Sequence, residues 1–119
     1  MAETIPLGDI AHSRSGDKGN HANIAVIAFQ PQGYNWLLQH LTAATVAEYF
    51  QALGATRVER FEAPNVWGLN FMLYDALAGG ASRSLRIDTQ GKALGQAILQ
   101  MPVLKPQNLS EMQAKPAKY

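Results

Sequence analysis

The order of strand-like and helix-like segments is what most constrains the fold of this chain. Two segments typical of strands, 5–13 and 22–29, come before helical segments that end near Gly54. Two more, 57–63 and 69–74, come before a final segment with helical periodicity. This repeated β-β-α order predicts an α+β fold in which a four-stranded, mainly antiparallel sheet carries its helices on one face.

The helices are indicated by apolar residues three or four positions apart. One stripe consists of Val46, Tyr49, Phe50 and Leu53, with Thr42 as the expected cap and Gly54 as the expected left-handed end. A second stripe consists of Leu94, Ile98 and Met101, with Asp88 as the expected cap. Residues 30–35 are predicted to form a turn that leads into a short helix, 36–41.

The alternation of residues along the later strands predicts which side chains share a face of the sheet. Leu69, Phe71 and Leu73 are expected on one face, and Asn70, Met72 and Tyr74 on the other. In the preceding strand, Phe61 and Ala63 share one face, and Arg60 and Glu62 share the opposite one. We expect both faces of the later strand, 69–74, to be partly covered.

The last residues differ in composition from the rest of the chain. Residues 102–119 contain three prolines and almost no apolar periodicity, which predicts an extended or disordered tail after a domain that spans 1–101. Removing the residues after Pro106 should then leave thermal stability nearly unchanged.

Composition limits the class of protein. A chain of 119 residues fits one domain, and because it has no cysteine, disulfides, thiolate metal sites and cysteine nucleophiles are excluded. Its net charge of +1 gives no support to nucleic-acid binding. No apolar run approaches the roughly 20 residues of a membrane span, so we expect a soluble, cytoplasmic protein.

A polar stretch between the first two predicted strands is the main candidate for function. It consists of Arg14, Ser15, Gly16, Asp17, Lys18, Gly19 and Asn20. Gly16 and Gly19 allow a close approach to the backbone, and Arg14 and Lys18 can pair with a carboxylate or a phosphate. We therefore predict an anion-binding loop. An ordinary polar turn is the alternative, because turns use the same residue types.

Other polar residues could join this loop if the first and fourth strands are neighbours. They are Asn23, Asn65, Asn70, Ser82, Ser84 and Arg86, with Gly79 and Gly80 before the last group. Such a set would suit a carboxylate, a phosphate or a thioester carbonyl. Each residue also has an ordinary explanation, such as a turn at Asn65 or a buried amide at Asn70.

Several other kinds of site lack the residues that they need. The polar stretch has no Gly-Lys-Ser/Thr ending for nucleotide phosphates, and Gly79-Gly80 does not open a dinucleotide fingerprint. His12 and His21 flank the stretch without the spacing of a metal pair, and no spacing joins a serine to a histidine and an acid. We expect neither a metal nor a cofactor.

The stretch Leu7 to Asn20, followed by Asn23-Ile24, resembles the start of the AtuA-like ferredoxin-fold domain. The later strings that carry the resemblance are Pro64-Asn65, Leu69-Asn70-Phe71, Gly79-Gly80, Ser84-Leu85-Arg86 and Asp88 to Gly95. The resemblance runs from about Leu7 to about Met101 and implies a ferredoxin-like sandwich. This domain is found at the C-terminus of acyclic terpene utilisation AtuA proteins and also as free-standing small proteins.

The resemblance implies a setting in the catabolism of branched acyl-CoA compounds. Because the chain lacks the large N-terminal domain of AtuA proteins, a separate larger AtuA-type subunit is an expected partner. We expect a small subunit or ligand-binding module for acyl-CoA or carboxylate compounds. The alternatives are a free-standing lyase or hydratase that uses Asp17 or a loop histidine, and a purely structural assembly domain. With 47% hydrophobic residues and one sheet face in need of a cover, a homo-oligomer is also expected.

Overall fold

Four antiparallel strands form the main sheet of the computed structural model, which describes residues 3–76 and 92–114. The strands are β2 (Ala11–Lys18), β3 (His21–Ala28), β4 (Arg57–Ala63) and β5 (Gly68–Tyr74). Their order across the sheet is β2-β3-β5-β4, so that two hairpins meet along the central pair β3–β5. The predicted α+β, ferredoxin-like class is confirmed.

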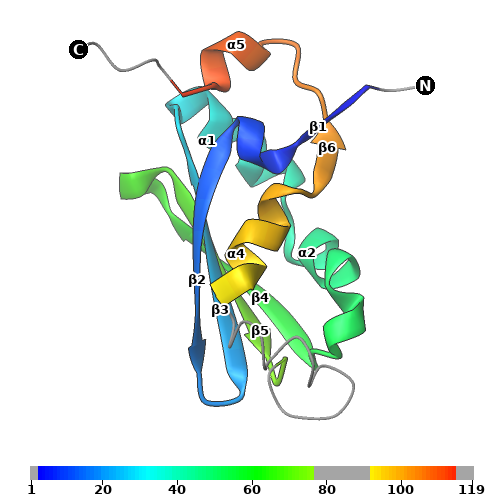
Figure 1. Ribbon diagram of the computed structural model, residues 1–119. Helices are drawn as coiled ribbons and strands as arrows, with labels where there is room; N and C mark the ends of the chain where they lie inside the picture. Colours follow the sequence, from blue (N-terminus) through cyan, green and yellow to red (C-terminus); the bar gives the residue numbers. More distant parts are fainter. Residues whose placement is uncertain (1–2, 77–91, 115–119) are drawn as a thin grey trace.

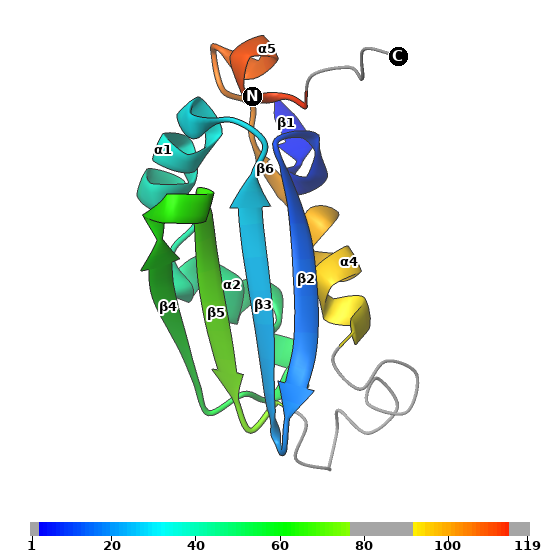
Figure 2. The same ribbon diagram turned by 90° about the vertical axis from the view of Figure 1, so that its left-hand side faces the viewer.

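The helices lie on one face of this sheet. They are α1 (Pro31–His40), α2 (Ala43–Tyr49) and α4 (Lys92–Leu99). With the sheet seen edge-on, the helices are all on one side (Figure 1), and a quarter turn brings the opposite face toward the viewer with no element of the described chain in front of it (Figure 2). The expectation that both faces of β5 are partly covered is therefore wrong for the described chain.

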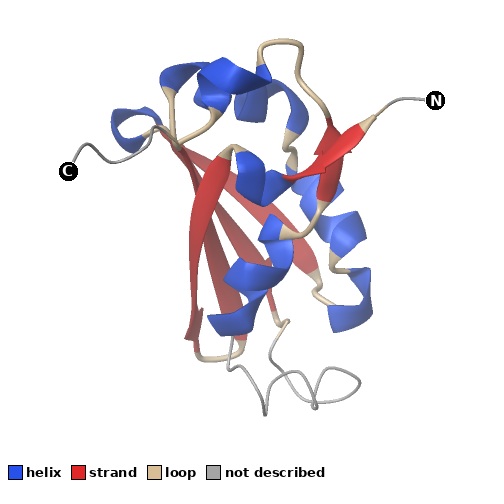
Figure 3. Cartoon of the chain, turned by 45° about the horizontal axis from the view of Figure 1, so that its top comes forward, coloured by secondary structure: helices blue, strands red, loops and turns tan. Residues whose placement is uncertain are grey.

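A second, two-stranded sheet joins the two ends of the domain. β1 (Thr4–Pro6) pairs with β6 (Pro102–Leu104), away from the main sheet (Figure 3). A 3₁₀ turn, Leu7–Asp9, connects β1 to β2. The predicted first strand, 5–13, is thus two strands in different sheets.

The core lies between the main sheet and the helices. Burial alternates strictly along β3, where Ala22, Ile24, Val26 and Ala28 face the helices. Leu69, Phe71 and Leu73 of β5 are buried on the same side, which confirms that they share a face. The opposite positions on both strands consequently form the uncovered face.

In strand β4 a charged residue faces the helices and an aromatic residue faces away from them. Arg60 faces the helices, where its guanidinium donates to the carbonyl oxygens of Leu38, at 3.0 Å, and Leu41, at 2.9 Å. Phe61 points to the uncovered face and is 46% exposed. A cation near the C-terminal carbonyls of α1 stabilises that helix end, so Arg60 occupies an inward position that is usually apolar.

Thr42 and Gly54 cap and end helical segments as expected, but α1 begins earlier than predicted. Pro31 begins α1, so the prediction of a turn at 30–35 is wrong; proline suits a first helical position because its missing N–H is not needed there. The side chain of Thr42 accepts the N–H of Thr45 and caps α2, as expected. Gly54 ends the following 3₁₀ turn in a left-handed conformation, φ 73°.

The tail is partly folded. Beyond β6, a short helix α5 (Leu109–Met112) packs on α1, and Met112 is only 4% exposed. The expectation of an extended or disordered tail is therefore wrong for α5. Its four residues are too few to show a helical period, and the helix packs on the domain through buried Met112 and partly buried Leu109.

Candidate functional site

The polar stretch that the sequence singles out is mostly β-strand. β2 continues through Lys18, and only Gly19 and Asn20 form the turn to β3. Gly19 has φ 63°, as a tight hairpin turn requires. The prediction that all seven residues form a loop is wrong, because pairing with the apolar strand β3 outweighs the weak strand preference of residues such as Gly16.

Ser15 of this stretch and Ser13, just before it, face the helices. Ser13 donates its hydroxyl to the carbonyl oxygen of Gly95 in α4, and the N–H of Gly95 donates to the hydroxyl oxygen of Ser15 at 2.9 Å. These contacts fasten α4 to β2. Ser15, predicted as a ligand-binding residue, thus has a structural contact here.

Arg14 lies on the opposite, uncovered face, together with Asn23 and Asn70. Arg14 pairs with Ala25 across β2 and β3, and Ala25 pairs with Asn70 across β3 and β5. β2 and β5 are separated by β3, so the condition that the first and fourth predicted strands be neighbours is not met. Three strands nevertheless bring these three predicted site residues to one face.

The side chains of these three residues have no polar partner within 3–76 and 92–114. No hydrogen bond or ion pair joins the side chain of Arg14, Asn23 or Asn70 to another described residue. Gly16 pairs with Asn23, and an added Cβ at Gly16 would lie 3.3 Å from the Asn23 amide oxygen. The guanidinium and the two amides are therefore available to a ligand or a partner from outside.

Several other predicted site residues that the structure describes do not gather at this place. Asp17 in β2 and Asn20 in the turn are exposed, and Lys18 ends β2. Asn65 is exposed in the 3₁₀ turn Pro64–Val66 between β4 and β5. Gly79, Gly80, Ser82, Ser84, Arg86 and the expected cap Asp88 lie outside the described residues.

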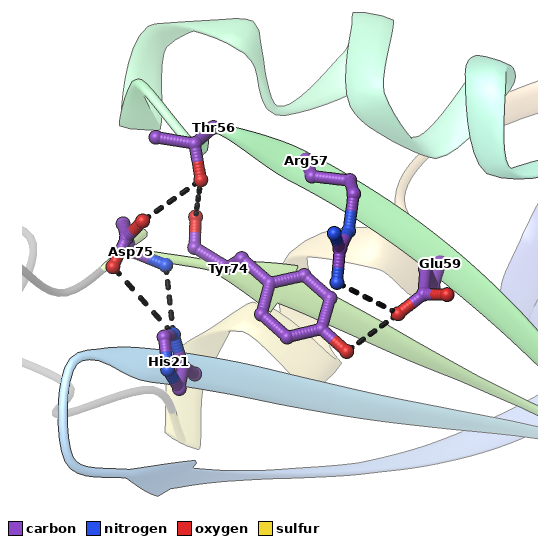
Figure 4. Close-up of polar contacts among 6 residues, drawn as sticks. All are labelled: His21, Thr56, Arg57, Glu59, Tyr74 and Asp75. Atoms are coloured by element: carbon purple, nitrogen blue, oxygen red, sulfur yellow. Dashed lines mark hydrogen bonds and ion pairs between the residues drawn. The ribbon is translucent and has the colours of Figure 1, made fainter.

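A cluster that the sequence reasoning did not find lies at the β2–β3 turn end of the sheet (Figure 4). The N–H of Asp75 donates to Nδ1 of His21 at 2.9 Å, and the hydroxyl of Thr56 donates to the Asp75 carboxylate at 2.8 Å. Because Nδ1 accepts an N–H, neutral His21 carries its proton on Nε2. Asp75 reaches His21 in a left-handed conformation, φ 61°, for which the sequence gives no signal.

Three further residues form the second half of this cluster. The Tyr74 hydroxyl donates to Glu59 at 2.5 Å, and Arg57 donates to the same carboxylate at 3.2 Å. The Arg57 guanidinium also lies 4.2 Å from the centre of the Tyr74 ring. The Tyr74 hydroxyl, followed by the charge of Glu59, raises the pKa of Arg57. The alternation of inward and outward residues along β4 and β5 could have indicated that these three side chains share one face.

Exposed apolar side chains continue from this face to the β4–β5 turn. Phe61, Val66 and Trp67 are 46%, 55% and 40% exposed. Trp67 has φ 57°, a left-handed conformation that is unusual for a bulky residue. Large exposed apolar groups of this kind are typical of interaction surfaces.

The family of the chain follows from a comparison with protein-family models. The model of the AtuA ferredoxin-like domain matches residues 5–104. The chain belongs to this family. Comparisons of this AtuA ferredoxin-like domain with curated proteins and with solved structures found no match.

Among the residues that the structure describes, no helix has the length and apolar character to cross a membrane. The same part of the chain contains no group of three or more histidine or acidic side chains that could hold a metal ion.

Proposed function

We propose that the chain is a small subunit of a cytoplasmic AtuA-type system that acts on branched or short acyl-CoA or carboxylate compounds. Its role is to assemble with other protein through the uncovered sheet face. Family membership supports the AtuA setting, and the face supports the assembly role.

The observation that carries this proposal is the composition of the uncovered face. It combines a half-exposed Phe61 with Arg14, Asn23 and Asn70, whose polar groups have no partner among the described residues. Aromatic residues, methionine and arginine are enriched at protein interfaces, and Met72 occupies the next outward position after Asn70. A flat face of this kind suits contact with protein better than enclosure of a small substrate.

Complex formation with a purified larger AtuA-type subunit tests the proposal. Asn70→Arg places a large charge in the middle of the face and should abolish co-elution in size-exclusion chromatography. The matched variant Gln96→Arg, on the exposed side of α4, should leave it intact. Equal co-elution of the two variants would contradict the proposal.

A second candidate function is carboxylate binding by the same polar residues. Arg14 can pair with a carboxylate, and the amide groups of Asn23 and Asn70 can donate further hydrogen bonds. The lack of described partners for all three residues favours this candidate. An acyl-CoA ester, free CoA or a short carboxylic acid would be the ligand.

Calorimetry with these compounds separates the second candidate from pure assembly. We expect Arg14→Ala to weaken carboxylate binding about tenfold or more, because a charge-assisted contact contributes roughly 1.5–3 kcal/mol. Lys105→Ala removes a cation that lies next to β6 and should leave binding unchanged. If wild type and both variants give the same heats, Arg14 binds no carboxylate.

A further inference from the structure

We infer that two copies of the chain pack face to face through the uncovered sheet, with β2 of one copy over β4 of the other. This inference rests on the proposed assembly role of that face and names the protein that covers it.

Strand order leaves two simple twofold arrangements for two such faces. An axis parallel to the strands, over the central pair β3–β5, places β2 over β4 and β3 over β5 of the second copy. An axis perpendicular to the strands places each strand over its own counterpart. Because the outward residues on β2 and β4 differ, the two arrangements bring different groups together.

The first arrangement gives Arg14 a favourable partner. Across the sheet, Arg14, Ala25, Asn70 and Phe61 lie in one row. The twofold axis therefore places Arg14 opposite Phe61 of the second copy, where a guanidinium can stack on the ring. The next row brings Glu59 of the second copy opposite Gly16, within reach of the same arginine.

The second arrangement brings like charges together. It places β2 over β2, and with the axis through the row of Arg14 it brings Arg14 next to Arg14 of the second copy, although neither has an acidic partner among the described residues. Two cations desolvated side by side repel each other. The arrangement with β2 over β4 aligns Lys18 with Arg57 of the second copy, but Glu59 already pairs with the charge of Arg57. Charge therefore favours β2 over β4.

Small outward residues provide room for the close approach of two sheets. Gly16 and Ala25 lie next to Arg14 on the face, and Gly68 lies in the row beyond. Packed sheets are about 10 Å apart and interdigitate their side chains, so that long side chains need small residues opposite them. Ala25 of one copy would face Asn70 of the other in the chosen arrangement.

The size of the face predicts a weak, reversible dimer. With strands about 4.8 Å apart and about 3.4 Å per residue, four strands of seven residues cover about 450 Å² per copy. Standard interfaces bury about 800 Å² per partner. Dimerisation should therefore be reversible and depend on protein concentration.

Two charge variants test the arrangement by sedimentation velocity. Arg14→Glu and Phe61→Arg each remove the contact between β2 and β4, so each variant alone should have a dimer dissociation constant raised about tenfold or more. Their equimolar mixture should dimerise at least as tightly as wild type. In the mixed dimer, one contact becomes an ion pair and the other keeps its native groups. Both positions are exposed, and circular dichroism confirms that each variant is folded.

Three outcomes would overturn the inference. Wild-type protein that stays monomeric at millimolar concentration excludes the dimer. A Phe61→Arg variant that dimerises as well as wild type by itself points to β2 over β2, and a mixture that fails to recover dimers excludes β2 over β4. If wild type forms no dimer while the larger subunit still binds it and does not bind Asn70→Arg, only the identity of the second copy is wrong and the assembly role stands.

Discussion

Replacing Gly95 by valine is expected to lower the free energy of unfolding by about 3 kcal/mol, because α4 approaches β2 too closely for a side chain. An added Cβ at Gly95 would lie 3.0 Å from the Ser15 hydroxyl oxygen and 3.1 Å from that of Ser13. These are the hydroxyls that bond the Gly95 backbone, so relieving the clash would also break those bonds.

Thermal unfolding measures this effect. A loss of about 3 kcal/mol corresponds to a fall in Tm of roughly 10 °C for a domain of this size. Gln96→Val is the matched control, since it adds the same β-branched side chain at the next, exposed position of α4. Equal melting of the two variants would mean that the contact between α4 and β2 does not restrict Gly95.

Because α5 is folded, the expectation that the tail can be removed without loss is revised. Removing the residues after Pro106 should destabilise the domain by about 3 kcal/mol, through the loss of buried apolar groups. The truncation removes Met112, which is 4% exposed, and the partly buried Leu109 that packs beside it. α5 lies so near α1 that an added Cβ at Gly33 would be 3.7 Å from the Cβ of Met112.

Urea unfolding of two truncated chains tests this second prediction. A chain that ends after Ala114 keeps every described contact of the tail and serves as the control for the one that ends after Pro106. The shorter chain should unfold at a clearly lower urea concentration, with Met112→Ala between the two. Coincident midpoints would show that the tail does not stabilise the domain.

The sequence predicted best which residues of a strand face the core, where apolar and polar residues alternate along it. In β5, Leu69, Phe71 and Leu73 must be buried together, so the period of two determines the face of each residue. β2 has no such apolar pattern after Ala11, and its strand forms because β3 supplies the pairing partner. A prediction based on the strand preference of single residues therefore assigned a loop to residues that belong to β2.

The sequence predicted several residues of the candidate site, but it did not predict how they lie relative to one another. Alternation assigns Asn70 to the outward face of β5, but the position of β3 between β2 and β5 depends on the whole sheet. The contact of Asp75 with His21 depends on a left-handed backbone at Asp75 and on the packing of two hairpins. No local pattern of residues indicates a strand order or a contact of this kind.

The central claim is that the uncovered sheet face is covered by protein in the assembled state, and cysteine labelling tests it most directly. The native chain has no cysteine, so Ala25→Cys places a single thiol in the middle of the face, and Gln96→Cys places one on the far side of α4. We predict that alkylation of Ala25→Cys slows at least about tenfold as protein concentration rises or the larger subunit is added, while Gln96→Cys reacts at a constant rate. An Ala25→Cys rate that stays constant under both conditions would contradict the claim.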